Sequence, residues 1–332
     1  MQVGQRYEIV SAGPRAERRS TLAREVRAGL SRVPRSIPSK YFYDEVGCRL
    51  FDEICDLPEY YLTRAERSLL VEHADTIVRQ AGAGALIEIG SGMARKTGAL
   101  LRAMCGRSPA PSYVPFDISA DVIEHSATEL LAAHPTLRVR GVVGDFAHDC
   151  DRLGAATHAL VGPRLFAFLG STIGNLDENE APLLLRKFAE LMTEHDRFLL
   201  GLDLVKDPRV LRAAYNDARG VTAAFNRNVL TVIARELDGE VDEQSFEHFA
   251  FYDSARQRVE MHLVSTRDQR LTLRLADLHV DLTKGEHLLT EISRKFTRES
   301  AERMLCGGGL RLTEWISDGR FAVCIARVSS LS

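Results

Sequence analysis

Three acidic side chains stand out because each lies inside or directly after a short apolar run. Glu88 interrupts the run that leads to Gly90 and Gly92, and Asp117 and Asp145 end two later runs. Glycines let a backbone approach a ligand closely and adopt φ values that other residues avoid. A carboxylate accepts hydrogen bonds from hydroxyl and amino groups. The pattern therefore predicts a site for a ligand that carries such groups.

The position three residues after Gly92 helps to distinguish two classes of nucleotide-binding site. A dinucleotide-binding turn needs a third glycine three residues after the second, and this chain has Arg95 there. Asp117 could accept from both hydroxyls of a ribose, and Asp145 from an adenine amino group while Phe146 stacks on the ring. Each acid alone is more often a turn residue or a helix cap, and a Gly-x-Gly alone can be purely structural. Together they favour an adenosine site without a phosphate, which S-adenosylmethionine (SAM) fits.

Between residues 65 and 205, apolar runs alternate with helical patterns. Strands are predicted at 85–89, 113–116, 139–143, 164–169 and 198–204, and helices at 94–104, 119–133 and 180–192. Strands that alternate with helices predict an α/β fold with a parallel, doubly wound sheet. Since ligands bind outside the carboxyl ends of such strands, Glu88, Asp117 and Asp145 should lie along one edge of the sheet.

The remaining segments predict a second domain. Helices are predicted at 208–215 and 225–237, and period-2 segments at 247–253, 259–265, 271–275 and 278–282 indicate an antiparallel sheet. A helix at 300–306 and strands at 310–316 and 320–328 predict a hairpin that closes the edge of the first sheet. We therefore expect one domain from residues 65–205 plus 296–332. An inserted α+β domain should comprise residues 1–64 plus 206–295.

Composition excludes several classes of protein. The net charge of -3 gives no general attraction to nucleic acid or to anionic membranes. The six cysteines form no CxxC pair, and the ten histidines show no metal-ligand spacing, so we expect reduced thiols and no metal site. No run of about 18 apolar residues predicts a membrane span, and the N-terminus lacks the apolar core of a signal peptide. We expect a cytoplasmic protein that works as a monomer on a small molecule.

The chain also resembles the histidine-specific Nα-methyltransferases of ergothioneine biosynthesis over nearly its whole length beyond residue 35. The segments that carry the resemblance are KYFYDEVGCRLFDEICDLPEYYLTRAE (40–66), IEIGSG (87–92), VPFDIS (114–119), GDF (144–146), FLGSTIGNL (168–176), DLVKD (203–207), AYNDARGVTAAFNRNVL (214–230) and LLTEISRKF (288–296). The resemblance implies a class I methyltransferase domain, with a Rossmann-like doubly wound sheet, joined to a family-specific substrate-binding domain. It also implies SAM as cofactor and three methyl transfers to the α-amine of L-histidine, which give hercynine.

The resemblance further implies which residues form the two halves of the site. On the cofactor side it indicates Gly90, Lys96, Asp117, Asp145 and Phe146, to which we add Glu88 and Gly92 from the turn itself. On the substrate side it indicates Tyr60, Asn175, Tyr215, Met261, Glu291 and Ser293, with Tyr43 beside the amine and Met261 against the imidazole. The departures from the family pattern are peripheral and lie at residues 93–95, Leu62 and Arg294.

Methyl transfer sets conditions on these residues. The attacking amine must be neutral, so Tyr43 and Asn175 are the candidate catalytic residues, because neutral acceptors tolerate the loss of the proton. A carboxylate beside the amine would favour the charged form, so we place Glu291 on the imidazole N–H and Ser293 on the other ring nitrogen. Asn175 and Tyr215 would bind the substrate carboxylate.

Each substrate residue has an ordinary structural interpretation as well. Tyr60 could be half-buried packing, Met261 core filler, Asn175 a turn residue and Glu291 a helix-capping acid. Three other functions also stay open. They are methylation of another amino acid or an indole derivative on the same scaffold, a nicotinamide-dependent dehydrogenase, and a binding module that senses the cofactor without catalysis. A single N–H on an indole would leave Glu291 or Ser293 without a partner, which favours histidine.

Overall fold

A computed structural model describes residues 6–10 and 15–329. The chain divides into two compact units. Among the described residues, unit 1 comprises 6–10, 62–205 and 296–329, and unit 2 comprises 15–61 and 206–295. Within the described ranges, no helix combines the length and the apolar character that crossing a bilayer requires.

An eight-stranded sheet forms the centre of unit 1, in the order β1-β5-β4-β3-β6-β7-β15-β14. The strands are β1 (Tyr7–Val10), β3 (Ala85–Ile89), β4 (Ser112–Asp117), β5 (Arg138–Val143), β6 (Arg164–Phe168), β7 (Arg197–Asp203), β14 (Leu310–Ser317) and β15 (Phe321–Val328). All neighbours from β1 to β7 pair in parallel, whereas β15 runs antiparallel to both β7 and β14. The predicted doubly wound sheet and its closing hairpin are confirmed.

The N-terminal segment departs from the expected domain division. Strand β1 pairs in parallel with β5 of the large sheet, from Tyr7 opposite Val139 to Val10 opposite Val142. The expectation that all of residues 1–64 pack with the insert is therefore wrong for this strand. The pairing joins segments about 130 residues apart, and local patterns do not specify a partner at that distance.

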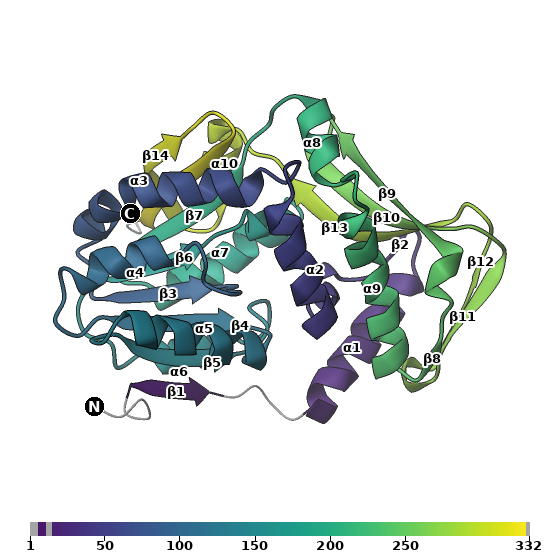
Figure 1. The fold of residues 1–332 in the computed structure, drawn as a ribbon, viewed down its shortest axis with the longest axis horizontal. Coiled ribbons are helices and arrows are strands. Elements are labelled where there is room, and N and C mark those ends of the chain that lie inside the picture. Colours follow the sequence, from purple (N-terminus) through teal and green to yellow (C-terminus); the bar gives the residue numbers. More distant parts are fainter. Residues whose placement is uncertain (1–5, 11–14, 330–332) are drawn as a thin grey trace. The chain divides into compact units, whose positions relative to one another are not determined.

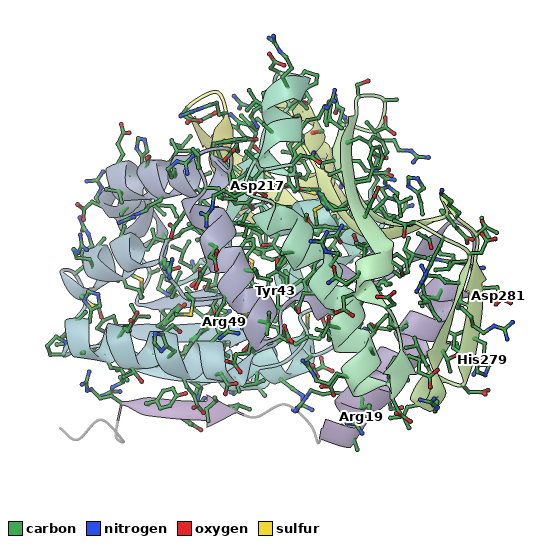
Figure 2. The ribbon with its side chains drawn as sticks, turned by 45° about the vertical axis from the view of Figure 1, so that its right-hand side comes forward. Arg19, Tyr43, Arg49, Asp217, His279 and Asp281 are labelled. Carbon is green, nitrogen blue, oxygen red and sulfur yellow. The ribbon has the colours of Figure 1, made fainter. Side chains whose placement is uncertain are left out.

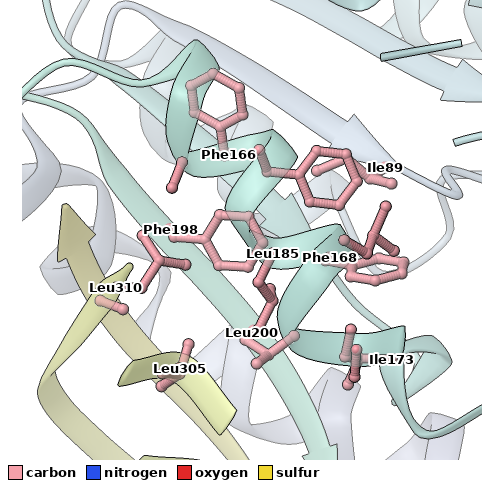
Figure 3. Packing of buried hydrophobic residues seen from close by; sticks show 14 of the residues in the cluster. Ile89, Phe166, Phe168, Ile173, Leu185, Phe198, Leu200, Leu305 and Leu310 are labelled. Carbon is pink, nitrogen blue, oxygen red and sulfur yellow. The ribbon is translucent and has the colours of Figure 1, made fainter. Parts of the chain in front are cut away.

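Helices cover both faces of this sheet. They are α3 (Leu62–Ala81), α4 (Gly98–Cys105), α5 (Ala120–Ala133), α6 (Cys150–Thr157), α7 (Glu180–Leu191) and α10 (Arg298–Gly307), and the 3₁₀ turn η3 (Thr172–Asn175) follows β6. Figure 1 shows α3, α4 and α5 on the face toward the viewer. On the other face, Leu185 of α7 and Leu305 of α10 join a fully buried cluster around Phe166, Phe168 and Phe198 (Figure 3). This core fixes the strands whose carboxyl ends carry the candidate site.

Unit 2 contains two small sheets. The first has the order β2-β13-β10-β9 and the second β12-β11-β8. The strands are β2 (Arg35–Ser36), β8 (Gly239–Glu240), β9 (Phe246–Asp253), β10 (Arg258–Ser265), β11 (Gln269–Leu273), β12 (Leu278–Leu282) and β13 (His287–Arg294). The prediction of one antiparallel sheet is thus wrong in two respects, because there are two sheets and β2 pairs in parallel with β13. The sequence patterns also missed β13.

Two helices of unit 2 are tied together through one carboxylate. The helical elements of the unit are α1 (Arg15–Leu30), η2 (Ser39–Phe42), α2 (Glu45–Asp56), α8 (Pro208–Ala214), α9 (Val221–Glu236), η4 (Glu243–Ser245) and η5 (Arg274–Ala276). Asp44 caps α2 by accepting from the Gly47 N–H at 2.8 Å. It also accepts from Asn228 at 2.8 Å and from Arg235 at 2.9 Å, both on α9. These bonds fix the turn that carries Tyr43.

Candidate functional site

The turn after β3 has the backbone that its glycines predict. Gly90 has φ +65° and Gly92 has φ +49°, in the left-handed region where other residues are strained. The N–H of Gly90 donates to the carbonyl of Phe116 at 2.8 Å, and the N–H of Gly92 donates to the Asp117 carboxylate at 2.8 Å. The structure therefore brings the glycine turn and the acid at the end of β4 together, as the sequence predicts.

Asp117 can still bind a ligand while it holds this turn. One of its oxygens accepts from the Gly92 N–H, and the other accepts from the Ser119 N–H at 3.0 Å. Burial raises the pKa of its carboxyl, although these backbone donors oppose the rise. The two oxygens have four lone pairs, and the backbone N–H groups of Gly92, Ser119 and Ile118 use three of them, so one stays available for a ribose hydroxyl.

Glu88 is a buried residue of β3, two positions before Gly90. Only 2% of the residue is exposed, and its two oxygens accept hydrogen bonds from the hydroxyls of Thr97 and Tyr113. Burial raises the pKa of its carboxyl to about 7. Glu88 thus links β3 to Tyr113 of β4 and to Thr97, which precedes α4.

Asp145 and Phe146 follow the next strand of the same edge. Val143, the last residue of β5, pairs with Asp117. Asp145 accepts from the Ala147 N–H at 2.9 Å, and its own N–H donates to Asp149 at 2.9 Å. The ring of Phe146 meets that of Phe168 edge to face, with centroids 5.5 Å apart. A ring anchored in this way on the core can offer its free face to a flat ligand.

Lys96 lies in the loop between β3 and α4 and pairs with a residue that the sequence analysis missed. Its ammonium lies 2.6 Å from a carboxylate oxygen of Glu66 on α3. Glu66 is fully buried, and it also accepts from the Gly170 N–H at 2.7 Å. The available signal was the position of Glu66 within the helix, four residues after buried Leu62 and four before buried Leu70. An acid within an apolar helical stripe needs a partner.

Asn175 ends η3, in the loop that follows β6. This loop begins with Gly170 at φ +78° and Ser171 at φ +57°. Ser171 is not a glycine, so its left-handed conformation is strained. Its hydroxyl accepts from the Asp203 N–H at 2.9 Å, which holds the strained turn against the end of β7. Asn175 is half-buried and belongs to unit 1, whereas the other predicted substrate residues belong to unit 2.

In unit 2, strand β13 places the two predicted ring-binding residues on one face. Successive side chains of a strand alternate between its faces, so Glu291 and Ser293 point the same way, and Lys295 follows at the same spacing. Met261 of β10 pairs directly with Glu291, and the register shifts by a bulge immediately after Met261. The interpretation of Glu291 as a helix-capping acid is wrong, because it lies within a strand.

Tyr215, Ser293 and Lys295 form a buried triangle of polar groups. The Tyr215 hydroxyl donates to the Ser293 hydroxyl at 2.7 Å, and the Lys295 ammonium donates to Ser293 at 2.8 Å and to Tyr215 at 3.0 Å. The three residues are exposed by 5% or less. Lys295 was not among the predicted residues. Its signal was the alternation of polar residues along 291–295, which places it on the same face as Glu291.

The carboxyl of Glu291 changes its protonation state near neutral pH. Burial raises the pKa of its carboxyl to about 7, while the positive charge of Lys295 opposes the rise. Near neutral pH this side chain is therefore poised between a charged acceptor and a neutral acid. A carboxylate with this pKa can recognise an N–H donor and report on pH at the same time.

Aromatic rings border these polar groups. Tyr60 is buried and meets Tyr215 edge to face, with centroids 6.3 Å apart, and it meets Phe51 at 6.2 Å. Burial raises the pKa of Tyr60 well above its ordinary value, so its hydroxyl stays neutral. Tyr43, labelled in Figure 2, follows η2 and packs on Phe51 and Phe225 at 5.6 and 5.7 Å. The structure thus gathers six predicted substrate residues in unit 2, with Tyr43 and Tyr60 joined through Phe51.

Comparison with known proteins covers both units. Residues 22–328 match a family described as "Histidine-specific methyltransferase, SAM-dependent". The chain is 44% identical to a histidine N-alpha-methyltransferase of Mycolicibacterium smegmatis, over 92% of this chain and 94% of that protein. It is 42% identical to a protein of the same name from Mycobacterium tuberculosis, with the same coverage. It is also 29% identical to "Ergothioneine biosynthesis protein 1" of Neurospora crassa, over 90% of this chain and 34% of that protein.

Proposed function

Because the chain belongs to the SAM-dependent, histidine-specific methyltransferase family, we propose that it transfers methyl groups from SAM to the α-amine of L-histidine. Three successive transfers would give hercynine, the trimethylated amino acid, as a step toward ergothioneine. The observation that carries the proposal is the polar face of β13, where buried Ser293 and half-buried Glu291 lie two residues apart beside Met261.

Glu291 and Ser293 together offer the hydrogen-bond acceptor and donor that a neutral imidazole ring needs. An ionised Glu291 can only accept, so it takes the ring N–H. The Ser293 oxygen already accepts from Tyr215 and Lys295, so its own proton is available to the second ring nitrogen. A neutral imidazole offers one donor and one acceptor, which matches this pair. Met261 would supply an apolar contact to the flat ring.

The amino-acid end of the substrate needs different chemistry. We propose that Asn175 donates its amide N–H to the substrate carboxylate. Tyr215 could assist only by redirecting the proton that it now donates to Ser293. The attacking amine must lose its proton, and the neutral hydroxyl of Tyr43 and the amide oxygen of Asn175 would accept from it without favouring the ammonium form. Glu291 acts at the ring and away from the amine for the same reason.

The residues at the carboxyl edge of the unit 1 sheet fit SAM. A Cβ added to Gly92 would meet no described atom within 4 Å, so open space lies beside the turn. Asp117 would accept from a ribose hydroxyl, and Asp145 and Phe146 would receive the adenine. Lys96 would face the carboxylate of the methionine part, and Glu88 would support the turn. The sulfonium supplies the electrophilic methyl group, so the protein contributes mainly alignment and exclusion of water.

The test is mass spectrometry of the purified full chain with methyl-deuterated SAM and a panel of amino acids. The panel includes histidine, tryptophan and phenylalanine, which differ in their ring donors and acceptors. We expect a mass gain of three labelled methyl groups on histidine and none on the other two. Methylation of tryptophan in preference to histidine, or labelling of an imidazole nitrogen, would refute the proposal.

A further inference from the structure

Glu66 is a fully buried acid of unit 1 that is not among the residues assigned to the cofactor. It lies on α3 with 0% exposure, between the buried residues Leu62 and Leu70 of the same apolar stripe. A carboxylate in such a position is unstable unless it is paired and hydrogen-bonded. The groups that pair with Glu66 therefore indicate its role in the structure.

Those partners come from two different loops. Both oxygens of Glu66 accept from the Gly170 N–H, at 2.7 and 3.0 Å, and one lies 2.6 Å from the Lys96 ammonium. Lys96 belongs to the loop after β3, and Gly170 belongs to the loop after β6 that leads to Asn175. Strands β3 and β6 are neighbours in the sheet. One buried carboxylate thus holds two adjacent loops at the edge where the cofactor residues lie.

The surrounding backbone leaves room for this carboxylate. Gly201 on β7 lies against it, and a Cβ at that position would overlap a Glu66 oxygen. A Cβ on Gly170 would come within 3.0 Å of the Lys96 ammonium, and Gly170 also has φ +78°. Both positions therefore require glycine for the Glu66 cluster to form.

We propose that Glu66 is a positioning residue with two functions. Through its ion pair it holds the Lys96 ammonium where the carboxylate of the methionine part of SAM can reach it. Through Gly170 it fixes the strained turn at Ser171 and so the loop that ends at Asn175. The inference rests on the proposed function, because that function assigns Lys96 to the cofactor and Asn175 to the substrate.

Two substitutions at Glu66 separate these functions. Glu66→Gln keeps the size of the side chain and an oxygen that accepts from Gly170, but it removes the charge that holds Lys96. Without the charged contact to Glu66, Lys96 is no longer held in place for the SAM carboxylate. We expect the Kd for SAM to rise about 10-fold, the size of one hydrogen bond to a charged group, while kcat changes little. Glu66→Ala removes both contacts, so kcat should fall as well. Glu72→Gln, an exposed acid on the same helix, is the matched control and should leave both values unchanged.

A double-mutant cycle with Lys96→Met tests whether Glu66 acts through Lys96. In the Lys96→Met background, Glu66→Gln should change the Kd for SAM less than about 2-fold, because the partner is already absent. The Kd is measured by calorimetry on the full chain without histidine. If the two substitutions raise the Kd for SAM by factors that multiply in the double variant, or if Glu66→Gln leaves this Kd unchanged, the inference is overturned. This test does not require Glu66→Ala to fold.

The outcome for Glu66 can be separated from the outcome for the proposed function. Calorimetry reports on the cofactor alone, whereas mass spectrometry identifies the methylated amino acid. If the protein binds SAM but methylates a different amino acid, the proposed substrate is wrong. The double-mutant cycle still decides whether Glu66 acts through Lys96. If the protein does not bind SAM, both proposals fail.

Discussion

Replacing Glu291 by glutamine gives the sharpest test of ring recognition. The two side chains have nearly the same size, so the change removes the charge without opening a cavity. Burial raises the pKa of the Glu291 carboxyl to about 7, against the opposing charge of Lys295. Above that pH the wild-type side chain is an ionised acceptor for the imidazole N–H. Glutamine offers only a neutral acceptor at every pH.

The size of the effect follows from the kind of hydrogen bond. A bond to a charged group contributes about 1.5 to 3 kcal/mol, and a neutral bond contributes about 1 kcal/mol. The difference of about 0.5 to 2 kcal/mol predicts a loss of about 2- to 30-fold in kcat/KM for histidine at pH 8.5, with about 10-fold at the middle of that range. Glu291→Ala should lose about 100-fold, because it leaves the ring N–H without a partner.

The pH dependence of a ratio isolates Glu291 from the titrations of the substrate. The imidazole and the amine of histidine ionise identically with either enzyme, so their effects cancel when kcat/KM of the wild type is divided by that of Glu291→Gln. Since kcat/KM reports the free enzyme, the ratio should fall as the pH drops through about 7. At pH 6, only about one carboxyl in ten is ionised, and the ratio should approach one.

The assay is initial-rate kinetics with saturating SAM between pH 5.5 and 9. Glu247→Gln, an exposed acid on β9 of the same unit, is the matched control and should show a constant ratio close to one. The Kd for SAM should be unchanged in both variants. A ratio for Glu291→Gln that stays constant over the whole pH range would refute the role of the ionised carboxylate. Equal losses of histidine use and cofactor affinity in Glu291→Ala would refute the division of roles between the units.

Three further predictions concern stability, measured by denaturant unfolding. Burial raises the pKa of Glu88 from 4.5 to about 7, so the wild type loses stability as the pH rises between these values. Glu88→Gln should therefore be more stable than the wild type by up to about 3 kcal/mol at pH 8, but not at pH 4.5. A stability difference that does not depend on pH would contradict this. Asp196→Asn should cost about 3 to 5 kcal/mol because it leaves buried Arg164 unpaired, and a loss under 1 kcal/mol would show that the pair is dispensable. Gly201→Ala should cost about 1 to 3 kcal/mol by overlap with Glu66, and the double variant with Glu66→Ala should recover part of that loss.

The regular parts of the fold were predictable because their hydrophobic patterns are local. The strand at 85–89 has the predicted bounds, since a buried apolar run ends there at glycine. The pairing of β1 with β5 was not predictable, because it depends on contacts distant in sequence. Helix α6 was also missed. It spans eight residues and contains Gly154, which weakens a helical pattern.

The failure at β13 has a different cause. Pattern analysis detects a strand by its alternation of apolar and polar residues, and one face of β13 carries Glu291 and Ser293 in addition to Lys295 immediately beyond its end. Leu289 stands at the same alternate spacing as Glu291 and Ser293, and Thr290 lies between Leu288 and Ile292 in the other set, so both sets mix apolar and polar residues and no alternation is visible. The same argument applies to Glu66 within the apolar stripe of α3. The candidate site residues were therefore found from motifs, while the strand that carries two of them was not.

Burial of charge does not by itself mark a functional residue, as the pair of Arg164 and Asp196 shows. Asp196 is fully buried, and it accepts from the Arg164 side chain at 2.6 Å and from the Thr193 N–H at 2.7 Å. Burial would raise the pKa of its carboxyl, but these donors outweigh burial and hold it below its ordinary value. Arg164 begins β6, and Asp196 directly precedes β7, so the pair lies at the amino ends of the strands.

Position along the strands distinguishes this pair from Glu66. Ligands of doubly wound sheets bind at the carboxyl ends of the strands, so a buried charge at the amino ends contributes to stability alone. Glu66 instead contacts Gly170, just beyond the carboxyl end of β6. We therefore expect Asp196→Asn to lower the unfolding free energy without changing the Kd for SAM at low temperature. Glu66→Gln should change the Kd with a smaller effect on stability, and the reverse pattern in the two variants would show that strand polarity does not separate structural from functional charges in this protein.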